Sequence, residues 1–344
     1  MNLILEAVKK ALTDGEATVN LNEASAITGS GSNVGGRVIY DDAFAALRYA
    51  NPLRLVCRQI TTIGSDEAFV VKTGNATNIQ NGTNNPWGYP INTNNGSPNI
   101  ATAFWQLPVR SINAVVPIRT AVLSDINNLP STIVDDIMLE FAQQEGLSMV
   151  LNNDQSGSTT VQTGATSGLR GLNQYAGSTS AASFGSNGSA ITNGLHTVKQ
   201  VTMGSNSAFA YNDIANLAAA LPAQYWNNPS TAWMMHPQTI QALRELKDNG
   251  GLPLFLDIGE TDGYSIGNIF GFPVIPNPYM SVLASGAYPV YLAAWDRFLT
   301  IADNETMKIQ MLEQTAPGFV TVFAEKRVCS TIRDVFAGVR LVAP

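Results

Sequence analysis

The sequence predicts an α+β protein whose most distinctive elements are a long two-stranded β-arm and one long helix. Two β-prone runs, EAFVVKT (67–73) and IATAFWQLPV (100–109), flank an asparagine-rich stretch. The segment STIVDDIMLEFAQQEGLSMVLNN (131–153) has the apolar periodicity of a helix. The chain closes with GFVTVFAEKRVCSTIRDVFAGVRLV (318–342), which has the composition of β-strands. Helical and strand segments that are separated in this way favour an α+β fold.

The predicted β-arm has a large polar tip. Residues 74–100 contain nine asparagines, four glycines and three prolines, so this stretch cannot build a core of its own. The arm therefore needs a surface outside itself to lie on. We expect Trp87 and Tyr89 at the tip to contact a neighbouring subunit, and Lys72 and Trp105 on the flanking strands are further candidates for contacts between subunits.

The predicted long helix has start signals and one apolar face. Ser131 or Thr132 can cap it, and Asp135 and Asp136 lie in the early turns, where the helix dipole favours acids. At roughly 30 Å, its length suits a strut. Its apolar face consists of Ile133, Ile137 and Phe141, with Val134 and Met138.

A second, shorter helix is predicted in the middle of the chain. Asn212 or Asp213 can cap it, and an apolar side follows at helical spacing. The predicted apolar side consists of Ile214, Leu217, Ala218 and Leu221.

The first 50 residues predict an extended arm with few anchors, apart from a short helix at 2–12. Because the lysines follow the apolar residues, this start does not resemble a signal peptide. No apolar run is long enough for a transmembrane helix. We therefore expect the chain to stay in the cytosol in which it is made, with no contact to a membrane.

The charge content points to a chain that is covered by other proteins. Only 13% of the 344 residues are charged, against about a quarter in typical soluble domains. Other copies of the same chain are the simplest cover. The net charge of −7 argues against tight phosphate binding, which needs a basic patch.

Catalytic motifs are missing from the sequence, and its two histidines have structural explanations. The segment STAWMMHPQTIQALRELKDNGG (230–251) predicts a strand, a stop at Pro237 and a short helix that ends at Gly250 or Gly251. His236 then lies at the helix N-cap. The sequence nominates neither a nucleophile nor an orienting acid for it, and His196 receives no role. The buried side of this helix is predicted to be Ile240, Leu243 and Leu246.

The cysteines and histidines of the sequence do not indicate a metal site or redox chemistry. Cys57 and Cys329 lie far apart and form no C-x-x-C pair, so they are expected to be buried thiols. Two cysteines and two histidines rarely close a zinc site. No catalytic residue, metal or cofactor is therefore expected.

Several stretches, taken in order, resemble the major capsid proteins of tailed bacteriophages, whose fold is named after phage Hong Kong 97. The segment VPIRTAVLSDINNLPSTIVDDIMLEFAQQEGLSMVLNND resembles the strand and spine helix of that family's peripheral domain. AWMMHPQTIQALRELKDNGGLPLF and IFGFPVIPNPYM resemble its axial domain, and FVTVFAEKRVCSTIRDVFAGVRL resembles the closing return to the peripheral domain. The β-arm resembles its E-loop.

The resemblance implies a domain plan. It comprises an N-terminal arm (1–50), an E-loop (63–108), a peripheral domain (51–62, 109–206 and 319–344) and an axial domain (207–318).

The resemblance also implies a function. The chain would self-assemble through pentamers and hexamers into an icosahedral head shell around double-stranded DNA, without sequence-specific DNA binding. Assembly would take place in the bacterial cytoplasm, and the product would be the virion capsid. A separate scaffolding protein, a portal and a possible decoration protein are the implied partners. Some relatives cross-link subunits through lysine and asparagine, but no acid partner can be placed for Lys72, so we expect subunits that are not cross-linked.

Two alternatives stay open from the sequence alone. A shell of the same fold could enclose enzymes, as encapsulins do; the length and the asparagine-rich arm favour the phage shell instead. A β-rich enzyme or carbohydrate-binding protein is suggested by the asparagine, glycine and serine content, with Trp87 and Tyr89 as the binding aromatics.

Overall fold

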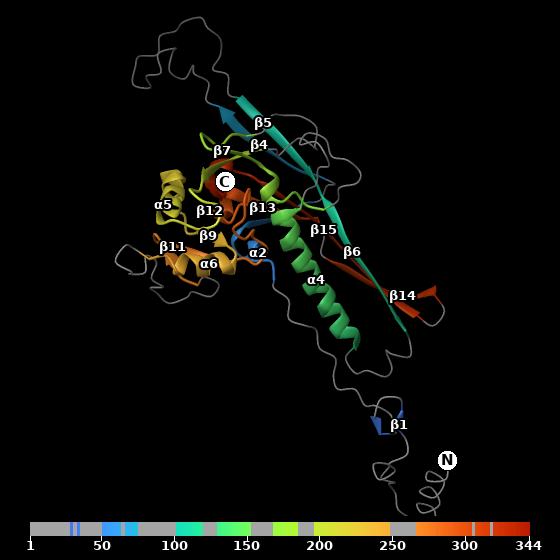
Figure 1. The fold of residues 1–344 in the computed structure, drawn as a ribbon. Coiled ribbons are helices and arrows are strands. Elements are labelled where there is room, and N and C mark those ends of the chain that lie inside the picture. The colour runs from blue at the N-terminus through green and yellow to red at the C-terminus, as the bar shows by residue number, and fades with distance from the viewer. Residues whose placement is uncertain are drawn as a thin grey trace, which may run out of the picture.

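The protein is described here by a computed structural model (Figure 1). The described residues are 28–29, 33–34, 50–62, 66–74, 101–119, 129–152, 168–184, 196–247, 266–304, 307–316 and 319–344. They form two larger mixed sheets, a separate two-stranded ribbon, a short pair of strands β1 (Thr28–Gly29) and β2 (Asn33–Val34), and several helices, of which one is long. The predicted α+β class is confirmed by this architecture.

The larger sheet has seven strands in the order β10-β11-β9-β12-β16-β8-β7. Parallel pairing joins β11 to β9, β16 to β8 and β7 to β8, and the remaining neighbours are antiparallel. The strands are β7 (Ala176–Ser178), β8 (Thr197–Thr202), β9 (Thr231–Met235), β10 (Asn268–Ile269), β11 (Phe272–Pro276), β12 (Val290–Ala294) and β16 (Gly338–Val342).

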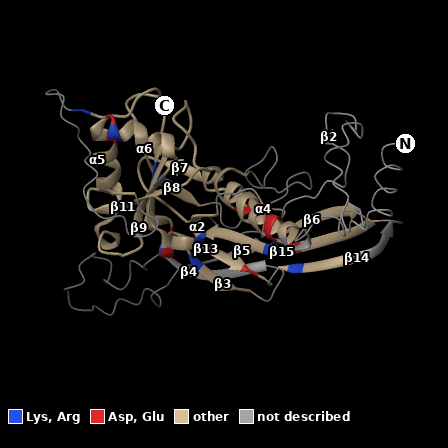
Figure 2. Cartoon of the chain, turned by 90° about the horizontal axis from the view of Figure 1, so that it is seen from below, with Lys and Arg blue, Asp and Glu red and all other residues tan. Residues whose placement is uncertain are grey.

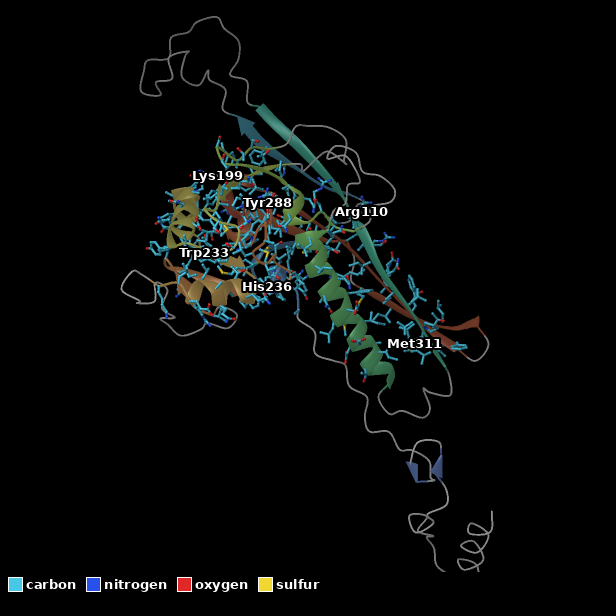
Figure 3. All side chains as sticks on the ribbon, viewed as in Figure 1. Arg110, Lys199, Trp233, His236, Tyr288 and Met311 are labelled. Atoms are coloured by element: carbon cyan, nitrogen blue, oxygen red, sulfur yellow. The ribbon has the colours of Figure 1, made fainter. Side chains whose placement is uncertain are left out.

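Both faces of this sheet are covered, which explains the unbroken apolar runs of its central strands. Every residue of β9 is buried, and the strand's side chains alternate between two cores. Trp233 and Met235 pack with the helices α5 (Tyr211–Ala220) and α6 (Pro237–Arg244), while Met234 joins the core on the other face. Figure 3 shows Trp233 in the interior of this unit, with His236 nearby.

The second sheet is built around β15 (Phe319–Ile332). One edge of β15 pairs with β14 (Lys308–Ala316). β13 (Leu299–Asp303) pairs with the C-terminal part of β15 along the same edge as β14, and it in turn pairs in parallel with β3 (Arg58–Thr61). The other edge of β15 pairs with β6 (Arg110–Arg119). Figure 1 shows β6, β15 and β14 extending away from the seven-stranded sheet.

The long helix α4 (Leu129–Leu151) packs against both sheets, because a different side of the helix is buried in each of its halves. In its first half, Ile137 and Phe141 pack on β6 and β15. In its second half, Met149 and Val150 enter the core of the seven-stranded sheet. The buried stripe therefore winds around α4 and does not follow one straight face.

Two details of the predicted helix are wrong for that reason. Met138 was expected on the apolar face, but 43% of it is exposed because it lies on the side turned away from the sheet. The helix begins at Leu129, so Ser131 and Thr132 lie inside it and do not cap it. The predicted apolar face is confirmed at Ile137 and Phe141, which are buried, and Ile133 packs against them partly buried.

The shorter helices agree more closely with the sequence. The predicted apolar side of α5 is confirmed, since Ile214, Leu217, Ala218 and Leu221 are all buried. The predicted cap differs: Ala210 precedes the helix, and the Asp213 carboxylate reaches back to accept from the Ala210 N–H at 3.0 Å.

The region around α6 confirms most of its prediction. Pro237 occupies the start of the helix, and the Nδ1 of His236 accepts from the Gln238 N–H at 3.1 Å. Ile240 and Leu243 are buried. The helix ends at Arg244, before the expected glycines, which lie outside the described residues.

The two sheets do not follow the residue ranges of the domain plan, because each sheet contains strands from both of the units that the plan names. β8 and β16 lie in the seven-stranded sheet with β9 and β12, although the domain plan groups 109–206 and 319–344 together in the other unit. β13 and β14 belong to the sheet of β15. Pairing between strands that are far apart in the sequence determines which sheet each strand joins, and local sequence patterns do not reveal this pairing.

Candidate assembly surface and its anchor

The β-arm is present as a ribbon of two strands, β4 (Asp66–Gly74) and β5 (Ala101–Pro108). Among the described residues, β4 and β5 pair only with each other. Figure 1 shows the ribbon running along the molecule toward one end. An isolated two-stranded ribbon is at best marginally stable in water, so this element favours a further surface to lie on.

The backbone places two of the four predicted contact residues on this ribbon. Trp105 is opposite Phe69, and Lys72 is opposite Thr102. Because side chains alternate along a strand, the register assigns positions 72 and 105 to opposite faces of the ribbon. Trp87 and Tyr89 lie outside the described residues.

A second exposed apolar surface lies on the sheet of β15. Helix α4 covers one face of this sheet, and Figure 2 shows no described helix on the other. The register places Val115 opposite Phe323, and both Pro117 and Leu312 opposite Thr321. We call Val115, Pro117, Leu312 and Phe323 the open sheet face; Val115 is 60% exposed and Leu312 41%.

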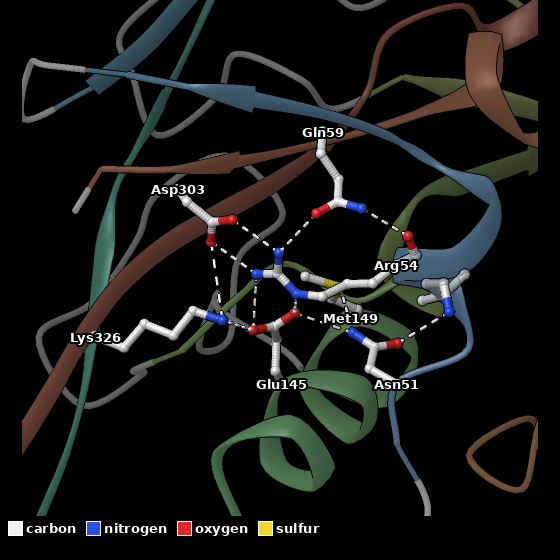
Figure 4. A network of polar contacts seen from close by, with 8 residues as sticks. Asn51, Arg54, Gln59, Glu145, Met149, Asp303 and Lys326 are labelled. Atoms are coloured by element: carbon white, nitrogen blue, oxygen red, sulfur yellow. Dashed lines mark hydrogen bonds and ion pairs between the residues drawn. The ribbon is translucent and has the colours of Figure 1, made fainter. Parts of the chain in front are cut away.

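A charged cluster anchors the segment that precedes the ribbon (Figure 4). It joins Arg54 of α2 (Leu53–Val56), Glu145 of α4, Asp303 of β13 and Lys326 of β15. α2 begins three residues after the described part of the chain resumes at residue 50, and β3 leads from it toward β4. The cluster therefore holds the part of the chain between residue 50 and the ribbon.

Arg54 is at the centre of this anchor. Its Nη1 donates to Asp303 Oδ2 and its Nη2 to Asp303 Oδ1, both at 2.7 Å. Its Nη2 also donates to Glu145 Oε2 at 2.9 Å, and its Nε donates to the other oxygen of Glu145. Bidentate pairing of this kind fixes orientation as well as distance.

Glu145 is fully buried and has three charged or polar partners. Besides Arg54, Lys326 Nζ donates to its Oε2 at 2.6 Å, and Asn51 Nδ2 donates to its Oε1 at 3.0 Å. A buried carboxylate is tolerated when it is paired and its lone pairs are used. Two cations and two carboxylates leave the cluster neutral.

The cluster changes the titration of its exposed members. Burial alone raises the pKa of Asp303, but the hydrogen bonds from Arg54 and the charges of Arg54 and Lys326 outweigh it and lower the pKa below its ordinary value. Burial alone lowers the pKa of the Arg54 guanidinium, but the two carboxylates outweigh it and raise the pKa. Arg54 and Asp303 are therefore both charged at neutral pH.

The sequence analysis missed this anchor. Its members are spread from residue 51 to residue 326, so no local motif contains them. One signal was available: Phe141, Glu145 and Met149 follow one another at a spacing of four, so Glu145 falls on a face that is otherwise apolar. A single acid at such a position indicates a buried partner.

The described side chains include no metal-binding group, and both histidines have structural contacts. In the described part of the chain, no group of three or more His, Cys, Asp or Glu side chains is placed to hold a metal ion. His196 is buried, and its Nε2 lies 3.1 Å from the Ile332 carbonyl oxygen. His236 caps α6. No described helix has the length and apolar character needed to cross a membrane.

The comparisons with known proteins decide the family. The model of the phage capsid family matches residues 37–341. The chain belongs to the phage capsid family. Members of this family are major capsid proteins, so the chain is a structural protein that forms a shell with copies of itself. No curated protein gives a significant match.

Solved capsid structures share the fold of this phage capsid protein. The capsid of an empty GTA particle is 21% identical with a TM-score of 0.71, covering 93% of this chain and 98% of that chain. Mycobacterium phage Cain is 13% identical with a TM-score of 0.58, covering 95% and 99%. The SrpI encapsulin of Synechococcus elongatus PCC 7942 is 11% identical with a TM-score of 0.59, covering 88% and 91%.

Proposed function

We propose that this capsid protein builds the icosahedral head shell of a tailed bacteriophage, with pentamers and hexamers enclosing double-stranded DNA. The single observation that carries the proposal is the β4–β5 ribbon, which pairs with no third described strand. Such a ribbon gains a partner when copies assemble side by side. In this function it is the E-loop, and α4 is the spine helix.

The open sheet face supports the same function. It is apolar, it is exposed, and it belongs to the unit from which the ribbon extends. We infer that the ribbon of a neighbouring copy covers this face, with Lys72, Trp87, Tyr89 and Trp105 as its contact residues. Head-to-tail contacts between identical chains close into rings when the rotation allows it.

The charged anchor gives the proposed arms a fixed base on the body of the chain. Arg54, Glu145, Asp303 and Lys326 tie the arm roots to both α4 and the sheet of β15. We propose the domain plan of an N-terminal arm (1–50), an E-loop (63–108), a peripheral domain (51–62, 109–206 and 319–344) and an axial domain (207–318), with strands exchanged between the last two. A scaffolding protein, a portal and a possible decoration protein complete the proposed partners, and assembly takes place in the bacterial cytoplasm.

An encapsulin-like shell that encloses protein is the second candidate, because the SrpI encapsulin has the same fold at a TM-score of 0.59. The contents of purified particles separate the two. Nuclease-protected DNA of uniform length supports the phage head, and a co-purifying enzyme supports the encapsulin. The family membership removes the basis for the third reading, a β-rich enzyme or carbohydrate-binding protein.

The role of the arm is tested by replacing both Trp87 and Tyr89 with alanine. We expect negative-stain electron microscopy to show fewer or less stable particles, while the unassembled chain keeps its unfolding midpoint. Asn92→Ala with Asn94→Ala is the matched control, since it changes the same segment without removing an aromatic ring. Particles of normal yield and stability from the aromatic double variant would contradict the role given to the tip.

A further inference from the structure

We draw no further inference here: the strongest candidate, the buried guanidinium of Arg340 on β16, whose Nε has no hydrogen-bond partner, carries no ligand site, because the packing around it closes that nitrogen to solvent and its Nη atoms already donate to acceptors of the same chain.

Discussion

Arg54 and Asp303 are joined by two parallel hydrogen bonds of 2.7 Å, although 249 residues separate them in the sequence. The pair fixes α2 on the end of β13, next to the parallel strand β3. The start of the compact body is thereby fastened to a strand from near its end. Both proposed arms leave the body close to this point.

Replacing Arg54 with methionine is expected to destabilise the chain strongly. The change leaves Asp303 with Lys326 at 3.9 Å and removes two of the bonds to the buried Glu145. Breaking a buried charge pair typically costs about 3 kcal/mol or more. The free energy of unfolding of the unassembled chain, measured by denaturant titration, gives the cost.

Arg327→Met is the control for that experiment. Arg327 is exposed and lies 3.4 Å from Glu325 on the same strand. Exposed pairs contribute roughly 0–1 kcal/mol, so this variant is expected to unfold nearly like the wild type. Similar losses in both variants would contradict the special role of the anchor.

The buried His196 is expected to make the chain less stable in acid. Burial lowers the pKa of His196 from 6.5 to about 4, against a smaller opposing effect of the Ile332 carbonyl, and the positive charge of Arg170 acts in the same direction as burial. The unfolded chain therefore takes up a proton near pH 6.5 that the folded chain refuses until about pH 4. Stability is complete above pH 6.5 and falls as the pH drops through this window, by up to about 3 kcal/mol.

Denaturant unfolding at pH 7.0, 5.5 and 4.5 measures this loss. His196→Gln keeps a hydrogen-bond donor but cannot titrate, so its stability is expected to change less over the same range. His236→Gln removes the other histidine, which is more exposed, and should keep most of the pH dependence. An unchanged slope in His196→Gln would show that another group controls the acid response.

Gly146 is expected to reject a side chain although it lies inside a helix. Alanine normally stabilises a helix relative to glycine by up to about 1 kcal/mol. At Gly146, however, a Cβ atom would lie 2.6 Å from Cε2 of the buried Tyr279 ring. Gly146→Ala is therefore expected to lower the free energy of unfolding by about 1–3 kcal/mol, as overpacking does.

Gly204→Ala provides the comparison, because nothing lies within 4 Å of a Cβ atom at that position. It is expected to change the unfolding free energy by less than about 0.5 kcal/mol. A gain in stability for Gly146→Ala would mean that Tyr279 moves aside at little cost.

The two cysteines are expected to resist modification in the folded chain. Cys57 is 7% exposed and Cys329 is 1% exposed, and burial raises the pKa of the Cys57 thiol, with a smaller contribution from Asp296. Only the thiolate reacts readily. A chromogenic disulfide reagent at pH 8 should release less than about one tenth of the colour in native chain that it releases in denaturant.

Local patterns predicted the elements that are stabilised locally. The strand TAWMM, the cap at His236 and the buried positions Ile240 and Leu243 all follow from residues within one short window, and each is confirmed. Leu246, predicted on the same side, lies beyond the end of α6 and is partly buried. The apolar side of α5 is confirmed for the same reason. In these segments, the residues that cap an element or form its buried side lie within the element or next to it in the sequence.

The features that the sequence did not predict depend on contacts between distant segments. Met138 is exposed because α4 turns its buried side as it passes from one sheet to the other. Arg54 and Lys326 meet Glu145 only after three elements have packed together. The spacing of apolar residues along a helix or strand does not reveal these contacts between distant segments.

The order of strands also determines when a newly made chain becomes usable. β15 is the strand that joins β6, β13 and β14, and β16 lies between β12 and β8. Both sheets therefore lack an inner strand until β15 and β16 have been synthesised. A chain that is interrupted before β15 closes neither sheet.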